Sequence, residues 1–142
     1  DVKICADLYR GVAEPLLAAV EKLKFEKLAW TAADWRHMGG ALACCTKLQS
    51  LNLTKMGADD AAMAAFCGAL GSGAAPALET LSLYKNTIDY NGMLHLSDAL
   101  ERGAAPVLKT LTLYHYVKFH DNPVDAAAEQ AVRDARPGLR II

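Results

Sequence analysis

The sequence predicts an α/β fold, a curved solenoid with parallel strands on its concave face and helices on its convex face. Three observations predict it: an internal repeat, a change of hydrophobic period within each repeat, and a proline at the same place before the later strands. Gly73 to Tyr84 reads GAAPALETLSLY and Gly103 to Tyr114 reads GAAPVLKTLTLY, with nine of twelve positions identical at a spacing of 30. Self-similarity at this period is typical of a stacked repeat architecture.

Each repeat opens with a short strand. Its apolar frame, Leu-x-x-Leu-x-Leu, alternates apolar and polar residues, as a strand with one buried face does. Complete copies begin at Leu48, Leu78 and Leu108, a conservative copy begins at Val20, and Leu139-x-x-Ile142 starts another. Pro76, Pro106 and Pro137 each stand two residues before the first apolar position of their repeat.

A helical pattern follows each strand. In the third repeat Ile88, Gly92, Leu96 and Leu100 are four residues apart, which places them on one face of a helix. The second repeat has the same spacing from Ala58 to Leu70, and Trp30, Met38 and Leu42 take the equivalent places in the first. We expect Asp59 and Asn91 to cap the second and third helices, and Pro123 to lie in the first turn of the fourth.

We expect one domain over residues 1–142, with repeats starting near 20, 48, 78 and 108 and a partial repeat from 139. A strand and helix of this size cannot bury their apolar faces alone, so neighbouring repeats must stack. Residues 1–19 are predicted to be a helical cap or a partial repeat in which a helix restarts at Pro15. The apolar segment Arg140-Ile141-Ile142 predicts that further chain or a partner covers the last repeat.

The repeated frame resembles the leucine-rich repeat family, and its units of 28 to 31 residues with a full helix resemble the ribonuclease-inhibitor subtype. The resemblance covers roughly residues 20 to 142 and implies a scaffold that binds other proteins. One departure concerns the Asn or Cys that the family places three residues after the third apolar position. Asn86 fits this pattern, whereas Leu28, Met56 and Tyr116 occupy the equivalent positions.

Composition and motifs argue against several functions. A formal net charge of -1 argues against nucleic-acid binding, and no apolar run is long enough to span a membrane. We find no nucleophile elbow, phosphate loop or zinc-protease motif, and Asp59-Asp60 fits helix capping better than catalysis. His115 and His120 lack the further ligands of a metal set. We therefore expect no enzyme, no metal and no cofactor.

The cysteines Cys5, Cys44, Cys45 and Cys67 lack the spacing of a disulfide framework and are predicted to be reduced and mostly buried. Together with the lack of a leader segment, this predicts an intracellular setting, most simply the cytoplasm. An organelle reached after removal of a targeting peptide remains the alternative.

Strand alternation predicts the concave face. Asn52, Ser82 and Thr112 should form one column across the sheet, Tyr84 and Tyr114 should be neighbours in the next, and Lys55, Lys85 and His115 should follow at the strand ends. Tyrosine is common at interface hot spots, and stacked lysines favour an acidic partner. We take these eight residues as the candidate partner-binding site, and the competing interpretation is an ordinary solvated face.

The sequence thus predicts a non-enzymatic protein-protein interaction module, a rigid repeat scaffold that binds a partner protein with an acidic surface. The alternative is a small structural subunit fixed in a larger multiprotein assembly through its uncapped end. Fold alone never fixes function, so the choice depends on the residues of the candidate site.

Overall fold

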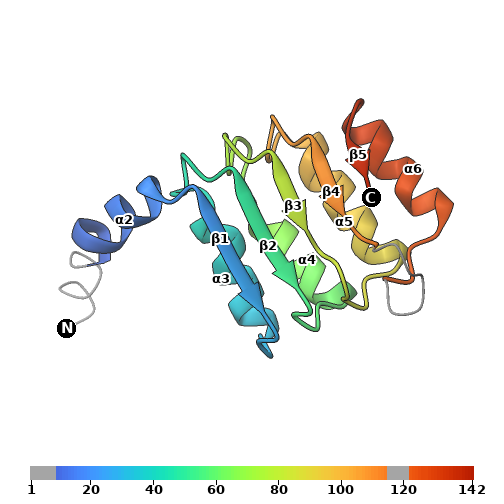
Figure 1. Ribbon diagram of the computed structural model, residues 1–142, viewed down its shortest axis with the longest axis horizontal. Helices are drawn as coiled ribbons and strands as arrows, with labels where there is room; N and C mark the ends of the chain where they lie inside the picture. The colour runs from blue at the N-terminus through green and yellow to red at the C-terminus, as the bar shows by residue number, and fades with distance from the viewer. Residues whose placement is uncertain (1–8, 115–121) are drawn as a thin grey trace.

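The computed structural model describes residues 9–114 and 122–142 and has an α/β fold. Five parallel strands form one sheet in the chain order β1-β2-β3-β4-β5, and helices cover one of its faces (Figure 1). Strand and helix alternate along the chain from β1 onward. This order is the one that the sequence repeat predicted.

The strands are β1 (Lys22–Glu26), β2 (Ser50–Thr54), β3 (Thr80–Ser82), β4 (Thr110–Thr112) and β5 (Arg140–Ile141). Their register places the central apolar residues of the repeats side by side: Leu23 pairs with Leu51, Leu51 with Leu81, and Leu81 with Leu111. Leu51, Leu81 and Leu111 are each at most 3% exposed. The predicted spacing is therefore confirmed, because equivalent leucines fill one continuous core between sheet and helices.

The helices of the repeats are α3 (Ala32–Ala41), α4 (Asp60–Ala69), α5 (Tyr90–Glu101) and α6 (Ala126–Ala135). Each packs against the next, α3 on α4, α4 on α5 and α5 on α6. Aromatic rings extend the core toward β1, where Phe25, Trp30, Trp35 and Phe66 pack in tilted and edge-to-face contacts with successive centroid distances of 5.0, 5.2 and 5.9 Å. Leu23 and Phe25 are half-buried, so the core is less completely covered under β1 than under β2.

Two asparagines hold the chain where it leaves the strands. Asn86 accepts hydrogen bonds from the N–H groups of Met56 and Ala58 and donates to the carbonyls of Leu53 and Leu83. Asn122 makes equivalent hydrogen bonds one repeat later: it accepts from the Ile88 N–H and donates to the carbonyls of Leu83 and Leu113. The fourth repeat, which the sequence marked as a departure because Tyr116 stands at the equivalent position, therefore does have this asparagine, further along the chain at Asn122. Tyr116 itself lies outside the described residues.

The helix caps agree with the sequence in one case and differ in two. Asp59 caps α4 through the Ala62 N–H, as predicted. Asp89, and not Asn91, caps α5, and its carboxylate accepts from the Asn91 N–H. The fourth helix begins after Asp125, which caps Ala128, so Pro123 lies before the helix and outside its first turn.

The two ends of the described chain also bear on the predictions. A π-helical segment, η1 (Tyr9–Ala13), is followed by α2 (Glu14–Ala19) with proline in its first turn, so the predicted restart at Pro15 is confirmed. At the other end Ile141, and not Ile142, pairs with Leu111. A shift of one residue turns a strand side chain to the opposite face, and Ile142 is accordingly 42% exposed.

Two further sequence expectations concern the membrane and the thiols. Within residues 9–114 and 122–142, no helix is both long and apolar enough to cross a membrane. Cys45 and Cys67 are buried free thiols and Cys44 is a half-buried one. Burial raises the pKa of Cys67 to about 12, so this thiol is neutral and behaves as a small apolar side chain.

Candidate partner-binding surface

The candidate surface is the side of the sheet turned away from the helices. Lys24 pairs with Asn52, Asn52 with Ser82, and Ser82 with Thr112, so the predicted column lies on adjacent strands. We use the name sheet face for the outward strand residues, Tyr84 beyond the end of β3, and the lysines that follow three strands: Lys22, Lys24, Glu26, Lys27, Ser50, Asn52, Thr54, Lys55, Thr80, Ser82, Tyr84, Lys85, Thr110, Thr112 and Arg140.

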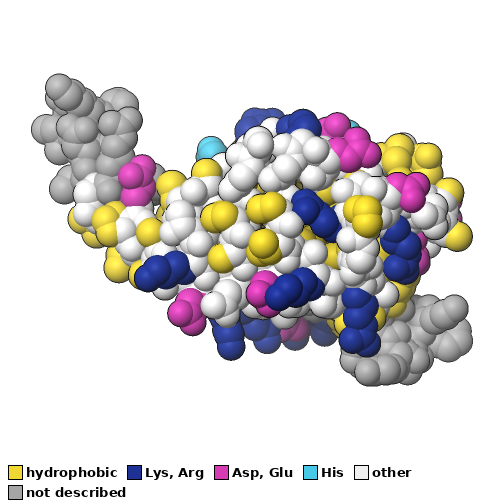
Figure 2. All heavy atoms as spheres, turned by 90° about the horizontal axis from the view of Figure 1, so that it is seen from above, with side chains coloured by type: hydrophobic (Ala, Val, Ile, Leu, Met, Phe, Trp, Pro, Cys, Tyr) yellow, Lys and Arg dark blue, Asp and Glu magenta, His cyan; other side chains and the backbone are white. Residues whose placement is uncertain are grey.

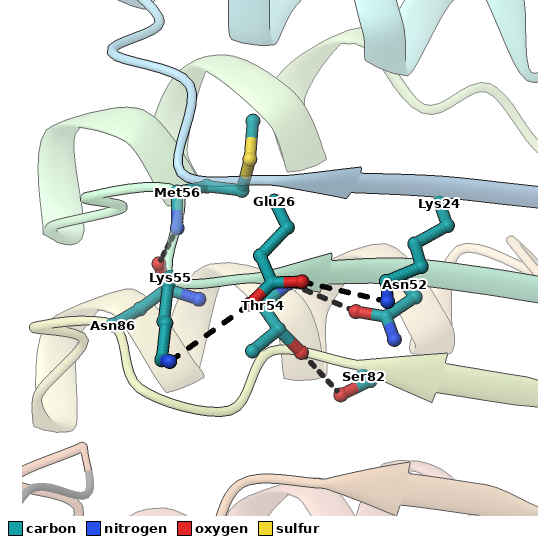
Figure 3. Close-up of polar contacts among 8 residues, drawn as sticks. All are labelled: Lys24, Glu26, Asn52, Thr54, Lys55, Met56, Ser82 and Asn86. Carbon is teal, nitrogen blue, oxygen red and sulfur yellow. Dashed lines mark hydrogen bonds and ion pairs between the residues drawn. The ribbon is translucent and has the colours of Figure 1, made fainter.

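Hydrogen bonds fix the polar side chains in the middle of the sheet face (Figure 3). The Thr54 backbone N–H donates to Oδ1 of Asn52 at 3.0 Å, which leaves the Asn52 amide group to present its N–H donors. The Thr54 and Ser82 hydroxyls lie 3.1 Å apart and form a hydrogen bond across β2 and β3. These side chains are pre-positioned, so a partner that binds here loses little side-chain entropy on their account.

The lysines at the strand ends share an uncommon backbone conformation. Lys27, Lys55 and Lys85 have φ values of 59°, 56° and 56°, in the left-handed region that non-glycine residues rarely adopt. Lys55 Nζ lies 3.8 Å from a Glu26 carboxylate oxygen, and Lys85 Nζ lies 5.2 Å from the centre of the Tyr84 ring. Lys55 and Lys85 therefore follow adjacent strands in the same backbone conformation, and His115 lies outside the described residues.

The two tyrosines of the predicted site differ in their surroundings. Tyr84 is half-buried beside Lys85 on the sheet face. The Tyr114 hydroxyl donates to Glu129 Oε1 of α6 at 2.8 Å and lies 3.3 Å from the Val124 carbonyl. Tyr114 thus ties β4 to the helix layer through its hydroxyl group. Ser82 pairs with Thr112, so Tyr84 and Tyr114 stand at equivalent positions two residues later, and their contact on the sheet face stays a prediction.

Charge is unevenly distributed between the two faces. The sheet face carries six basic residues and one acidic residue, Glu26, among those that the structure describes. The helices α3 to α6 with their caps carry nine acidic and four basic residues. Figure 2 views the molecule from the amino ends of the strands, and dark blue Lys and Arg side chains lie along its lower edge, on the sheet side. The net charge of -1 therefore conceals a basic face.

Glu26 and Lys24 were not among the predicted site residues, yet they belong to the same cluster. The Glu26 carboxylate contacts Lys24 Nζ at 3.4 Å as well as Lys55. Strand alternation gives the signal that could have found them, because residues two apart on one strand share a face. Glu26 also pairs directly with Thr54, the residue before Lys55.

Other sites on the described chain offer less chemistry. An open groove of about 330 Å³ is lined by Glu14, Pro15, Ala18 and Cys44, and holds a single ionisable carboxylate. Within the part of the chain that the structure describes, no three His, Cys, Asp or Glu side chains are placed to hold a metal ion. Burial and the neighbouring Asp89 carboxyl raise the pKa of Asp60, which lies at the junction of α4 and α5 and bonds the Asp89 N–H.

Comparison with known proteins gives a fold and no family. No family model and no curated protein matches the chain. Among solved structures, the chain is similar to one titled "Leiomodin-1 Actin-Binding Site 2 (ABS2)", with a TM-score of 0.67 and 18% sequence identity over 90% of this chain and 72% of that one. At this identity the likeness shows the fold alone, so the α/β arrangement of parallel strands and covering helices is one that a solved protein also adopts.

Proposed function

We propose that the chain is a non-enzymatic protein-binding module of the leucine-rich repeat type, and that its sheet face binds an acidic segment of another protein. The observation that carries the proposal is the charge of this face, six basic residues against one acidic residue in a chain whose net charge is -1. Complementary charge steers encounter and selects partners more than it adds affinity.

The chemistry of the sheet face supports this choice of partner. Lysine, arginine and the Asn52 amide are hydrogen-bond donors, so the sheet face offers mainly hydrogen-bond donors to a binding partner. Carboxylates are the protein side chains that only accept, which makes an Asp- or Glu-rich segment the best match. Helices are about 10 Å wide and strands are about 4.8 Å apart, so a stack with helices outside bends and the sheet face becomes concave.

The structural neighbour supports a protein partner in general terms, because its title describes an actin-binding site. Actin is therefore a reasonable first protein to test by co-sedimentation with the purified chain. The family assignment rests on the repeat frame and on the Asn86 and Asn122 hydrogen bonds, which close equivalent turns in successive repeats.

The decisive variant reverses charge at the strand ends, Lys55→Glu with Lys85→Glu. A control for the reversal of one charge is Lys109→Glu, at an exposed lysine at the other end of a strand whose Nζ lies 2.8 Å from Glu79. In a pull-down at low salt, a partner retained by the wild type and by the control should be lost from the double variant. The expected loss is roughly 2 kcal/mol or more. If all three proteins retain the partner equally, the binding surface does not include the strand-end lysines and the proposal for the sheet face is wrong.

A further inference from the structure

Glu26 occupies a distinctive place on the sheet face (Figure 3). One oxygen of its carboxylate lies 3.4 Å from Lys24 Nζ and the other lies 3.8 Å from Lys55 Nζ. The Glu26 side chain is 34% exposed, against 66% for Lys24. Its carboxylate lies between the two ammonium groups. Both cations are thereby engaged by the chain's own acid.

The backbone fixes this cluster. Lys24 and Glu26 lie two residues apart on β1 and so point to the same face. The Lys55 N–H donates to the Tyr84 carbonyl at 3.0 Å and its carbonyl accepts from the Lys27 N–H at 3.1 Å, which holds the Lys55 main chain between two neighbouring repeats. The two lysine side chains therefore start from fixed positions and converge on one carboxylate.

A carboxylate that takes one oxygen to each of two lysines is bound as an Asp or Glu of an acidic segment would be. Glu26 is also the one acidic side chain on the sheet face among the described residues. We infer that Lys24 and Lys55 form a carboxylate-binding subsite, and that Glu26 fills it as an internal competitor which an acidic residue of the protein partner displaces. This inference rests on the proposed function and adds a specificity-determining residue to it.

Displacement is physically accessible because ion pairs at an exposed surface are individually weak. The displaced Glu26 would still lower affinity, since its negative charge stays close to the incoming carboxylate. Two unit charges about 5 Å apart in water repel enough to change an equilibrium constant by roughly fourfold. We therefore expect Glu26→Gln to tighten binding of an acidic segment by roughly threefold to tenfold.

The probe is a fluorescein-labelled polyglutamate peptide, followed by fluorescence anisotropy at low ionic strength, with a polyglutamine peptide as the neutral reference. The matched control is Glu79→Gln. It removes the same charge from another Lys–Glu pair, in which Lys109 Nζ lies 2.8 Å from Glu79, beside the sheet but outside the sheet face. Thermal unfolding of each variant verifies that it is folded. Glu26→Asp keeps the charge and shortens the side chain, and gives a second measurement at the same position.

The expected result is tighter binding by Glu26→Gln than by Glu79→Gln, weaker binding by Lys24→Gln and Lys55→Gln, and Glu26→Asp between wild type and Glu26→Gln. The gain should disappear in the variant that combines Glu26→Gln with Lys55→Gln. Equal gains at Glu26 and Glu79, with binding still weakened by the lysine variants, would overturn the subsite and leave the proposed function standing. No binding of polyglutamate by any variant would overturn both.

Discussion

Asn86 provides the sharpest test of how the repeats are held together. Its side chain is 5% exposed and makes four hydrogen bonds to main-chain groups of two neighbouring repeats. In Asn86→Ala the N–H groups of Met56 and Ala58 and the carbonyls of Leu53 and Leu83 all lose this partner. We expect a large loss of stability from the removal of one amide.

The magnitude follows from those four groups. A buried polar group left without a partner costs about 1 to 3 kcal/mol, so four such groups set an upper limit of about 12 kcal/mol. Water that enters the space vacated by the amide will satisfy some of them, because the site is polar and lies where the chain turns. We therefore expect the free energy of unfolding to fall by about 3–5 kcal/mol, more than most single substitutions cause.

Urea denaturation followed by circular dichroism measures this loss, provided that the slope of the transition is unchanged. Asn122→Ala removes three equivalent bonds and should cost a similar amount, whereas Asn91→Ala, at an exposed position on α5, should change stability by less than about 0.5 kcal/mol. A cost below about 1 kcal/mol for Asn86→Ala would refute the reasoning, because the turns would then hold without the asparagine.

Three further outcomes are expected. Gly39→Ala should lower the free energy of unfolding by about 1–3 kcal/mol, because the added Cβ would meet a backbone carbonyl of α4. Gly40→Ala, where an added Cβ meets nothing within 4 Å, should instead raise it by about 0.5–1 kcal/mol, and thermal unfolding of the two variants measures the difference. Leu81→Ala should lower the free energy of unfolding by about 2–5 kcal/mol in urea, and Val107→Ala, at a position 42% exposed, by little. The pKa of Cys67 is higher in the folded protein than in the unfolded chain, so the thiol stabilises the fold fully below pH 9.0 and loses this stabilisation as pH rises toward about 12. Between about pH 8 and about pH 10, the free energy of unfolding of the wild type should therefore fall by about 1 kcal/mol more than that of Cys67→Ala.

The strand register was predictable because it depends on a property that sequence displays directly. Equivalent leucines recur at a fixed spacing, and only one register puts Leu51, Leu81 and Leu111 side by side in the core. Alternation then fixes which residues share the opposite face, so Asn52, Ser82 and Thr112 were placed correctly.

The sequence did not predict the contacts that join residues outside that spacing. Asn122 could not be recognised as the equivalent of Asn86, because the fourth repeat carries extra residues before it. Tyr114 turns toward Glu129, fifteen residues later in α6, and no strand pattern encodes that partner. Asp89 and Asn91 are both good capping residues, so sequence alone could not rank them.

The charge asymmetry has a physical origin in the same alternation. Inward positions of the strands must be apolar for the sheet to pack on the helices, whereas outward positions face no such requirement and are open to selection by a partner. Lysines at Lys55 and Lys85 stand in a left-handed conformation that glycine or asparagine would adopt at lower cost. Lysine at these two positions is thus a cost that the fold does not require, which agrees with the proposed role of both cations in binding an acidic partner.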